Sequence, residues 1–413
     1  MSVFSELRMQ NMRYSLYEVR RTEYQEDSQQ LQFRVAESPL KVSQELKKEI
    51  IGLGPILRMY LNAVIILYNL DNTVKQMLDN GKPNQFIGNN PQYLFLRPDL
   101  IISNEGIKIC EIETSMFGLG LADILNKAYI DSGYDTLVSE RQLKKYVQSV
   151  IPEEGVIAYS KRVKSFSGQL KYLAEQVFSG DNSNWKCEMV DENFNYTGNV
   201  YRAFYTSDCM TEQAVNCLVN SQSNFIPSLT PQFEEKAILS LIWDKRYKDF
   251  FKRELGKVVY DYLRKIIPPT FVLGQEKNFE MGLPGNVSNP LEISKLPKSK
   301  RQVVLKKSSD SSWGEGIKFL HKLSHDKVKD CLQTAMSSNE SYIIQDFFEG
   351  RKILMNYNVN NEVYTMQAKV RITPYYAFSG KDSGKLIAIK ATGCENTDYI
   401  HGATNSINTA VMA

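Results

Sequence analysis

Two short apolar segments that carry acidic side chains place the strongest constraint on how this chain folds. The first covers residues 97–102, and after a polar turn at 103–106 the second covers residues 107–115. β-Branched residues on either side of an Asn-Glu-Gly turn predict a β-hairpin. Carboxylates on such strands are costly to bury unless a cation meets them. The hairpin is therefore the first candidate functional site.

Glu111 and Glu113 are two residues apart, so a strand projects both carboxylates from the same face. Their mutual repulsion is expected to raise the pKa of at least one of them. A divalent cation would remove that repulsion, and hard oxygen ligands at this spacing suit Mg²⁺. The alternative interpretation is a solvent-facing edge strand that carries two surface acids.

Composition excludes several classes of protein and partner. The chain has 413 residues, 42% of them hydrophobic, enough for one large α/β enzyme or for roughly two to four domains. The formal net charge is +3, which gives no electrostatic signature of a nucleic-acid or acidic-membrane partner. The six scattered cysteines are expected to be free thiols. Three histidines leave little room for a His-based triad or a zinc site.

No targeting or membrane-spanning segment is predicted. Residues 1–27 mix charges throughout and lack the apolar core of a signal peptide. The most apolar run, residues 50–70, is interrupted by two glycines, a proline and Arg58, which favours a buried helix over a membrane span. We therefore expect a cytoplasmic protein, and the sequence gives no indication of its oligomeric state.

The order of the predicted elements divides the chain into four regions. Residues 1–90 are expected to be helical, and residues 91–150 hold the acidic hairpin. A strand, helix, strand order in residues 151–232 predicts a small Rossmann-like parallel layer, without a GxGxxG dinucleotide motif. Residues 233–413 combine a helical block with further strands and loops. The predicted fold class is therefore α/β, with α+β character.

A lysine at the end of a predicted strand precedes a small, polar loop. The strand covers residues 302–306 and ends at Lys306, and the loop covers residues 307–316. Loops of this composition can fold over phosphates with backbone N–H groups, while a lysine supplies positive charge. The segment is not a Walker motif, so by itself it does not identify a nucleotide site.

Taken in order, the motifs from about residue 94 to the C-terminus resemble the ATP-grasp superfamily in its circularly permuted form, as in eukaryotic-type glutathione synthetase and glutathionylspermidine synthase. In that family an Arg-x-Asp strand precedes a Glu-Ile-Asn strand and an aromatic-Gly turn. This chain has Arg97-Pro98-Asp99, Glu111-Ile112-Glu113 and Phe117-Gly118 in the same order.

Three later motifs of the family also have counterparts here. They are a lysine-bearing helix, a Leu-Lys-Pro strand with an acid four residues beyond the lysine, and the hinge that holds adenine. The matching segments are Asp244-Lys245-Arg246, Leu305-Lys306-Lys307 with Asp310, and Gln345-Asp346-Phe347-Phe348. The resemblance thus implies an ATP-grasp fold with a Rossmann-like substrate layer and a helical N-terminal region.

The resemblance also implies an ATP-dependent carboxylate–amine ligase with ATP and Mg²⁺ as cofactors. The implied Mg²⁺ ligands are Glu111, Asp310 and Glu113, the last in a position where the family has Asn. The implied ATP contacts are Lys245 and Lys306 on phosphates and Gln345, Asp346 and Phe348 at the adenine. The implied residues at the substrates are Arg97, Lys306, Arg371 and Lys390, with His401 as a further candidate.

Such a ligase first phosphorylates the acid with ATP, and the amine then attacks the acyl phosphate. Lysines and Mg²⁺ stabilise the charge that develops, without a covalent protein nucleophile. The loops at 278–300 and 308–316 would act as lids that keep water out. Amino acids, peptides and polyamines are all open as substrates. Ala388 stands where the family has an arginine, so the product need not be glutathione.

Two other functions compete with the ligase. A nuclease of the PD-(D/E)xK type would explain Pro98-Asp99 followed by Glu111. Its expected lysine is replaced by Glu113, however, and the chain has no basic footprint for DNA. The second alternative is a degenerate ligase that binds a nucleotide without catalysis.

Overall fold

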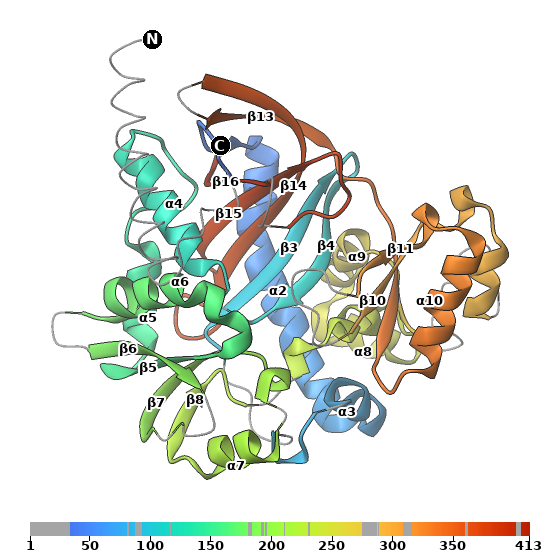
Figure 1. The fold of residues 1–413 in the computed structure, drawn as a ribbon, viewed down its shortest axis with the longest axis horizontal. Coiled ribbons are helices and arrows are strands. Elements are labelled where there is room, and N and C mark those ends of the chain that lie inside the picture. The colour runs from blue at the N-terminus through green and yellow to red at the C-terminus, as the bar shows by residue number, and fades with distance from the viewer. Residues whose placement is uncertain are drawn as a thin grey trace.

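The chain folds around three main β-sheets with helices packed between and beside them (Figure 1). This computed structural model describes residues 34–80, 82–86, 93–115, 117–180, 184–190, 194, 196–209, 211–229, 232–274, 287, 289–308, 316–359, 362–401 and 406–413. The mixture of helices with parallel and antiparallel sheets agrees with the predicted α/β class.

The largest sheet has seven strands and draws them from both ends of the described chain. In order across the sheet they are β1 (Arg34–Val35), β16 (Ser406–Thr409), β15 (Leu386–Glu395), β14 (Glu362–Ala377), β3 (Phe95–Ser103) and β4 (Gly106–Glu113), with β13 (Lys352–Val359) paired to the first half of β14. β1 and β16 pair in parallel, and the other neighbours are antiparallel. β3 and β4 form the predicted hairpin.

A β-bulge interrupts this hairpin at Cys110. Asp99 is paired with Glu111, whereas the next residue, Leu100, is paired with Ile109. The extra residue turns the second half of β4 over, because side chains alternate between the two faces of a strand. Ile109 therefore faces the same side as Leu100, and Glu111 faces the same side as Asp99. Without the bulge, the acids would share a face with the isoleucines.

Helix α2 (Gln44–Leu70) packs against the apolar face of this sheet (Figure 1). Ser43 caps its N-terminus by accepting a hydrogen bond from the Leu46 N–H, and α3 (Asn72–Asp79) follows directly. By length and composition α2 could cross a membrane, and half of its most apolar stretch is buried inside the fold. The predicted helix in residues 50–70 is confirmed, and one side of it is buried against the sheet.

The second sheet is the predicted Rossmann-like layer. It is parallel, with the order β6 (Asn184–Val190), β5 (Glu154–Ser160), β7 (Gly198–Ala203) and β8 (Ser223–Ile226). The helices of this part of the chain are α4 (Leu119–Asp131), α5 (Gln142–Val150), α6 (Ser167–Tyr172) and α7 (Glu212–Asn220), and a π-helical segment at Leu173–Phe178 continues α6.

The third sheet is antiparallel and lies at the other end of the molecule, beside α10 (His325–Ser337) (Figure 1). Its order is β11 (Lys318–Phe319), β10 (Val303–Lys307), β12 (Tyr342–Asp346) and β9 (Thr270–Val272). The predicted helical block consists of the 3₁₀ segments η6 (Lys236–Trp243) and η7 (Lys245–Tyr247), then α8 (Lys248–Leu255) and α9 (Lys257–Ile266).

Short strands near both ends of the described chain were not predicted. β1 pairs with β16, and β2 (Leu40–Lys41) pairs in parallel with β17 (Val411–Met412). A two-residue strand is too short to show periodicity, so only its pairing defines it. The described part of the predicted loop at 278–300 also contains two 3₁₀ segments, η10 (Pro290–Lys295) and η11 (Lys298–Lys300).

We predict that Gly54→Ala destabilises the fold. A Cβ at Gly54 would overlap the Gly384 carbonyl oxygen and the Tyr376 ring, because α2 approaches the β14–β15 connection closely there. We expect the free energy of unfolding in urea to fall by about 1–3 kcal/mol. Gly52→Ala is the matched control, since a Cβ there has no neighbour within 4 Å. It should stabilise α2 by up to about 1 kcal/mol. Equal effects of the two substitutions would contradict this packing.

Candidate active site

One face of the large sheet carries a charged cluster that spans four strands. The registers place Arg97 beside Glu113, Asp99 beside Glu111, and Thr373 beside Lys390. The opposite face carries the apolar residues that pack with α2. We call the charged residues the cluster: Arg97 and Asp99 on β3, Glu111 and Glu113 on β4, Arg371 on β14, Lys390 on β15, and the incoming Lys236 and Lys306 described below.

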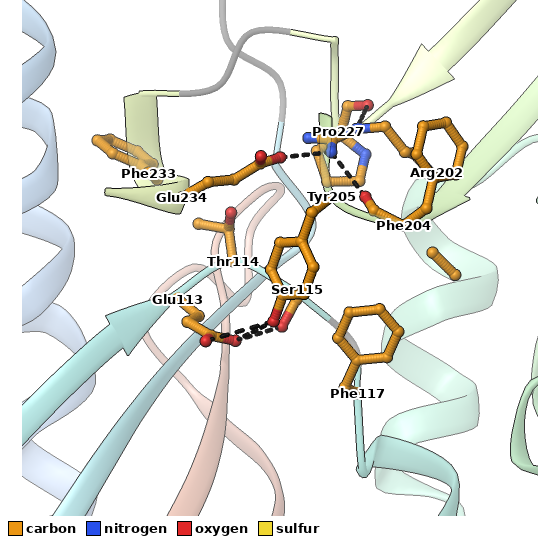
Figure 2. A pocket seen from close by; sticks show the side chains of 11 residues that line it. Glu113, Thr114, Ser115, Phe117, Arg202, Phe204, Tyr205, Pro227, Phe233 and Glu234 are labelled. Atoms are coloured by element: carbon orange, nitrogen blue, oxygen red, sulfur yellow. Dashed lines mark hydrogen bonds and ion pairs between the residues drawn. The ribbon is translucent and has the colours of Figure 1, made fainter. Parts of the chain in front are cut away.

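Arg97 and Glu113 form the first ion pair of the cluster. The Arg97 guanidinium also donates to the Phe117 carbonyl oxygen at 3.3 Å. The Glu113 carboxylate accepts hydrogen bonds from Ser115 Oγ at 2.6 Å and from Tyr205 Oη at 3.3 Å (Figure 2). Arg97 and Glu113 are both about one-eighth exposed, at 12% and 13% of their side chains. The pair therefore lies at the edge of the cluster, within reach of solvent.

Glu111 pairs with Lys236, the first residue of η6, at 2.9 Å. Burial raises the pKa of Glu111, but the Lys236 ammonium opposes this and holds it well below its usual range. For Glu113, burial and the neighbouring Glu111 carboxylate outweigh Arg97 and raise the pKa to about 7. The two-residue spacing predicted a raised pKa for one of the pair through mutual repulsion, and burial is the larger cause of the shift. Glu111 is thus the anionic member of the pair.

Asp99 lies at the centre of the cluster and is 3% exposed. Its carboxylate accepts hydrogen bonds from Arg371 Nη1 at 3.1 Å and from Thr373 Oγ1 at 3.0 Å. The Arg371 guanidinium loses solvation by burial, but Asp99 raises its pKa above the usual value. The carboxylate of the predicted Arg-x-Asp motif therefore orients an arginine from another strand.

Lys306 reaches the cluster from the third sheet. Its ammonium donates to the Cys110 carbonyl oxygen at 3.0 Å and to Gln345 Oε1 at 2.7 Å, and Gln345 in turn donates to Thr270 Oγ1. Burial lowers the pKa of Lys306, and the nearby Lys236 contributes to the shift. The bulge thus presents a carbonyl group that ties the third sheet to the large one.

Lys390 approaches the cluster beside the Phe117–Gly118 turn. A Cβ at Gly118 would lie 3.0 Å from Lys390 Cε and 3.0 Å from Tyr375 Oη, and its φ is +79°. Tyr375 Oη donates to the Phe117 carbonyl oxygen at 2.6 Å. The positive φ therefore favours glycine at position 118, and a Cβ there would also have to displace Lys390 and Tyr375 slightly.

Among the described residues, positive side chains outnumber negative ones in the cluster. Lys236, Lys306, Arg97, Arg371 and Lys390 face Asp99, Glu111 and Glu113. Within the described residues, Nε of Arg97 and Nε of Arg371 are buried without a hydrogen-bond partner. A buried excess of positive charge with unused donors is costly unless an anion joins it. The cluster therefore has the electrostatics of a site for a polyanion.

The start of the loop that follows β10 is fixed to η6. The Lys236 backbone N–H donates to the Ser308 carbonyl oxygen at 2.9 Å, and the Ala237 N–H donates to Ser308 Oγ at 3.1 Å. Ser308 Oγ donates to the Glu235 carboxylate, which also pairs with Lys82. The structure describes this segment up to residue 308 and again from residue 316, so Asp310 lies outside the described residues.

The other predicted site residues take up different positions. Lys245 is exposed in η7, and within the described residues no ion pair joins it to the cluster. Asp346 ends β12, and burial raises its pKa to about 6. Phe348 is half-buried in the segment that follows. His401 is half-buried, and its pKa is lowered by burial and by the nearby Arg371. The roles implied for them stay predictions.

The carboxylates at the end of β4 have the chemistry of a Mg²⁺ site. Mg²⁺ in phosphate-handling sites is typically held by one or two carboxylates together with the phosphates of the substrate, and Glu111 and Glu113 project side by side. Within the described residues no three His, Cys, Asp or Glu side chains come close enough to hold a metal by themselves. The pair therefore fits a cation shared with a phosphate ligand.

A pocket lies next to the cluster (Figure 2). It lies where β4 ends, beside the carboxyl ends of β7 and β8. Its lining includes Glu113, Ser115, Phe204 and Tyr205, together with Phe233 and Glu234 of η5 (Gln232–Glu234). The carboxyl edge of a parallel sheet is a common location for ligands.

Lys236, Tyr205 and Ser115 were missed as site residues by the sequence analysis. Lys236 precedes a run of apolar residues, and a 3₁₀ segment gives no 3.6-residue period that would show which side it faces. Tyr205 follows β7, so only the placement of one sheet against another brings it to Glu113. For Ser115, the position two residues after Glu113 was an available signal, because both lie on one face of an extended chain.

We predict that Glu113 makes the stability of the protein fall as pH rises. A carboxyl group whose pKa is raised from 4.5 to about 7 on folding favours the folded state below pH 4.5, and this contribution is lost as pH rises towards 7. Between pH 4.5 and 7.5, the free energy of unfolding of the wild type should fall by about 1–3 kcal/mol relative to Glu113→Gln, in metal-free buffer. Parallel curves for the two proteins would contradict the raised pKa. Glu105→Gln is the control, since that side chain is 80% exposed.

Comparison with known proteins bears on the fold. No family model and no curated protein matches the chain in sequence. Among solved structures, a glutathione synthetase-like effector from Globodera pallida in its apo form aligns with a TM-score of 0.56 at 12% identity, over 100% of this chain and 98% of that one. D-alanyl-alanine synthetase A from Vibrio cholerae O1 biovar eltor aligns over 63% of this chain and 88% of its own, at 11% identity and a TM-score of 0.28, too low to support an argument. The chain therefore has the α/β, ATP-grasp-like fold that its motifs predicted.

Proposed function

We propose that the protein is a circularly permuted ATP-grasp ligase that joins a carboxylate to an amine through an acyl phosphate. The observation that carries the proposal is the buried excess of positive charge between the large sheet and the third sheet. A triphosphate supplies the negative charge that this cluster lacks.

Lys306 and Lys236 are the proposed ligands of the ATP phosphates. One enters the cluster from β10 and the other from η6, and the Lys236 ammonium helps to lower the pKa of Lys306. Phosphate oxygens between them would convert this repulsion into two attractive interactions. Lys236 thus takes the role that the family resemblance gave to Lys245.

Glu111 and Glu113 are the proposed holders of Mg²⁺. When bound, the ion would neutralise charge on the transferring phosphoryl group. Glu111 is the stronger candidate because Lys236 keeps it anionic, whereas Glu113 must first lose its proton. The family resemblance implies Asp310 as a third carboxylate ligand, and that residue lies outside the described part of the chain.

Arg97 and Arg371 are the proposed binding groups for the carboxylate substrate. Each has a buried Nε without a partner within the described residues, and each is held in place by an acid through its other nitrogens. A carboxylate oxygen held there could attack the γ-phosphorus with ADP as the leaving group, and the amine would then attack the acyl carbon and release phosphate. Positioning and charge stabilisation are sufficient for both steps, so no protein nucleophile is required.

We predict that Lys306→Ala and Lys236→Ala each reduce turnover by roughly 10²–10³-fold, because each removes one charge that stabilises the transferring phosphoryl group. The measurement is phosphate release from ATP and Mg²⁺ with pooled amino acids and polyamines. Lys257→Ala, exposed at the start of α9, is the control and should retain activity. A larger loss in Lys245→Ala than in Lys236→Ala would restore the role that the resemblance gave to Lys245.

The same assay separates the ligase from its alternatives. A ligase consumes ATP only when both an acid and an amine are present. Nucleotide binding without turnover, in the wild type and in Glu111→Ala alike, would indicate a degenerate ligase. Cleavage of plasmid DNA with Mg²⁺ would favour the nuclease and would contradict the proposal.

A further inference from the structure

The pocket beside the cluster has aromatic walls. Phe204 and Tyr205 follow β7, Phe117 follows β4, and Phe233 lies in η5, and all four line the same space (Figure 2). Phe117 packs against Tyr205 with ring centroids 5.3 Å apart. Aromatic rings held in this way form a stable apolar surface for a ligand.

The charged side chains of the pocket are all paired within the protein. Glu234 pairs with Arg202 and accepts hydrogen bonds from the Thr206 N–H at 3.0 Å and from Thr206 Oγ1 at 2.6 Å. Arg202 also donates to the carbonyl oxygens of Phe204, Pro227 and Ser228.

Glu113, the remaining acid of the pocket, pairs with Arg97 and accepts from Ser115 and Tyr205. A charged ligand group in the pocket would therefore lose its hydration without meeting an unpaired partner of opposite charge. An apolar group has no such favourable hydration to lose, and burying its surface is favourable.

We infer that this pocket binds the apolar side chain of a substrate, an amino acid with an aliphatic side chain. The inference rests on the proposed ligase function and adds a substrate class to it. Since the pocket and the cluster share Glu113, an amino acid whose side chain lies among the rings has its backbone groups at the edge of the cluster, next to Arg97. The substrate's own carboxylate or amine is then placed where the reaction takes place.

Leucine and asparagine provide the most direct test, because their side chains have nearly the same shape and differ in polarity. Equilibrium dialysis of the wild-type protein with each radiolabelled amino acid, in the presence of a non-hydrolysable ATP analogue and Mg²⁺, requires no turnover. We expect leucine to bind roughly 10–200-fold more tightly than asparagine. Equal affinity, tighter binding of asparagine, or binding of neither would overturn the inference.

A substitution in the wall tests whether the selectivity arises in this pocket. Phe204→Ala widens the space, so the preference should shift from leucine towards phenylalanine. Phe225→Ala is the matched control, since Phe225 belongs to the same apolar core as Phe204 but does not line the pocket. It should leave the ratio of leucine to phenylalanine binding unchanged. The same shift in both variants would assign the effect to loosened packing and contradict a role for the pocket.

Turnover measurements keep this inference separate from the ligase proposal. If leucine binds selectively but no pair of acid and amine supports ATP consumption, the ligase proposal fails and the pocket assignment stands. If polar amino acids support turnover better than leucine, the ligase proposal stands and the pocket assignment fails.

Discussion

The whole arrangement depends on one extra residue in β4. Cys110 forms a bulge, so the two halves of β4 direct their alternate side chains to different faces of the sheet. Ile107 and Ile109 face the α2 core before the bulge, and Glu111 and Glu113 face the cluster after it. The carbonyl group of the bulged residue then receives Lys306 from another sheet. Core packing, acid placement and the joining of two sheets therefore share one local distortion.

The energetic consequence is a site whose buried positive charge is only partly neutralised by the acids of the protein. Lys306 is 7% exposed, and its pKa is lowered by burial and by the neighbouring Lys236 ammonium, so its charged form is disfavoured. Asp99 and Glu111 offset some of the buried positive charge but not all of it. Such a site is stabilised by whatever anion it binds, because a ligand that binds only the folded state adds its binding free energy to stability. Under the proposed function, the unfavourable free energy of burying these positive charges is relieved when the nucleotide binds, which strengthens its binding.

Features that depend on residues close together in the sequence could be predicted, whereas contacts between distant segments could not. Turn chemistry and alternation predicted the β3–β4 hairpin, and strand–helix order predicted the parallel layer, since both signals are local. The bulge had a sequence signal too, because the core-facing isoleucines are spaced at 107, 109 and then 112, a break in the two-residue period. Lys236 had none: its contact with Glu111 spans more than a hundred residues and depends on how η6 is placed against β4.

Glu113 connects the cluster to the pocket, and its environment explains why glutamate can occupy this position. It is held by Arg97 on the cluster side and by Ser115 and Tyr205 on the pocket side. An asparagine, the residue that ATP-grasp ligases of the resembling type have here, could accept these hydrogen bonds but could not balance the Arg97 charge. Glutamate can supply that charge, but burial and, to a lesser degree, repulsion from Glu111 oppose its ionisation and raise its pKa to about 7. The proposed Mg²⁺ would remove the repulsion, so metal binding and release of the Glu113 proton are expected to be coupled.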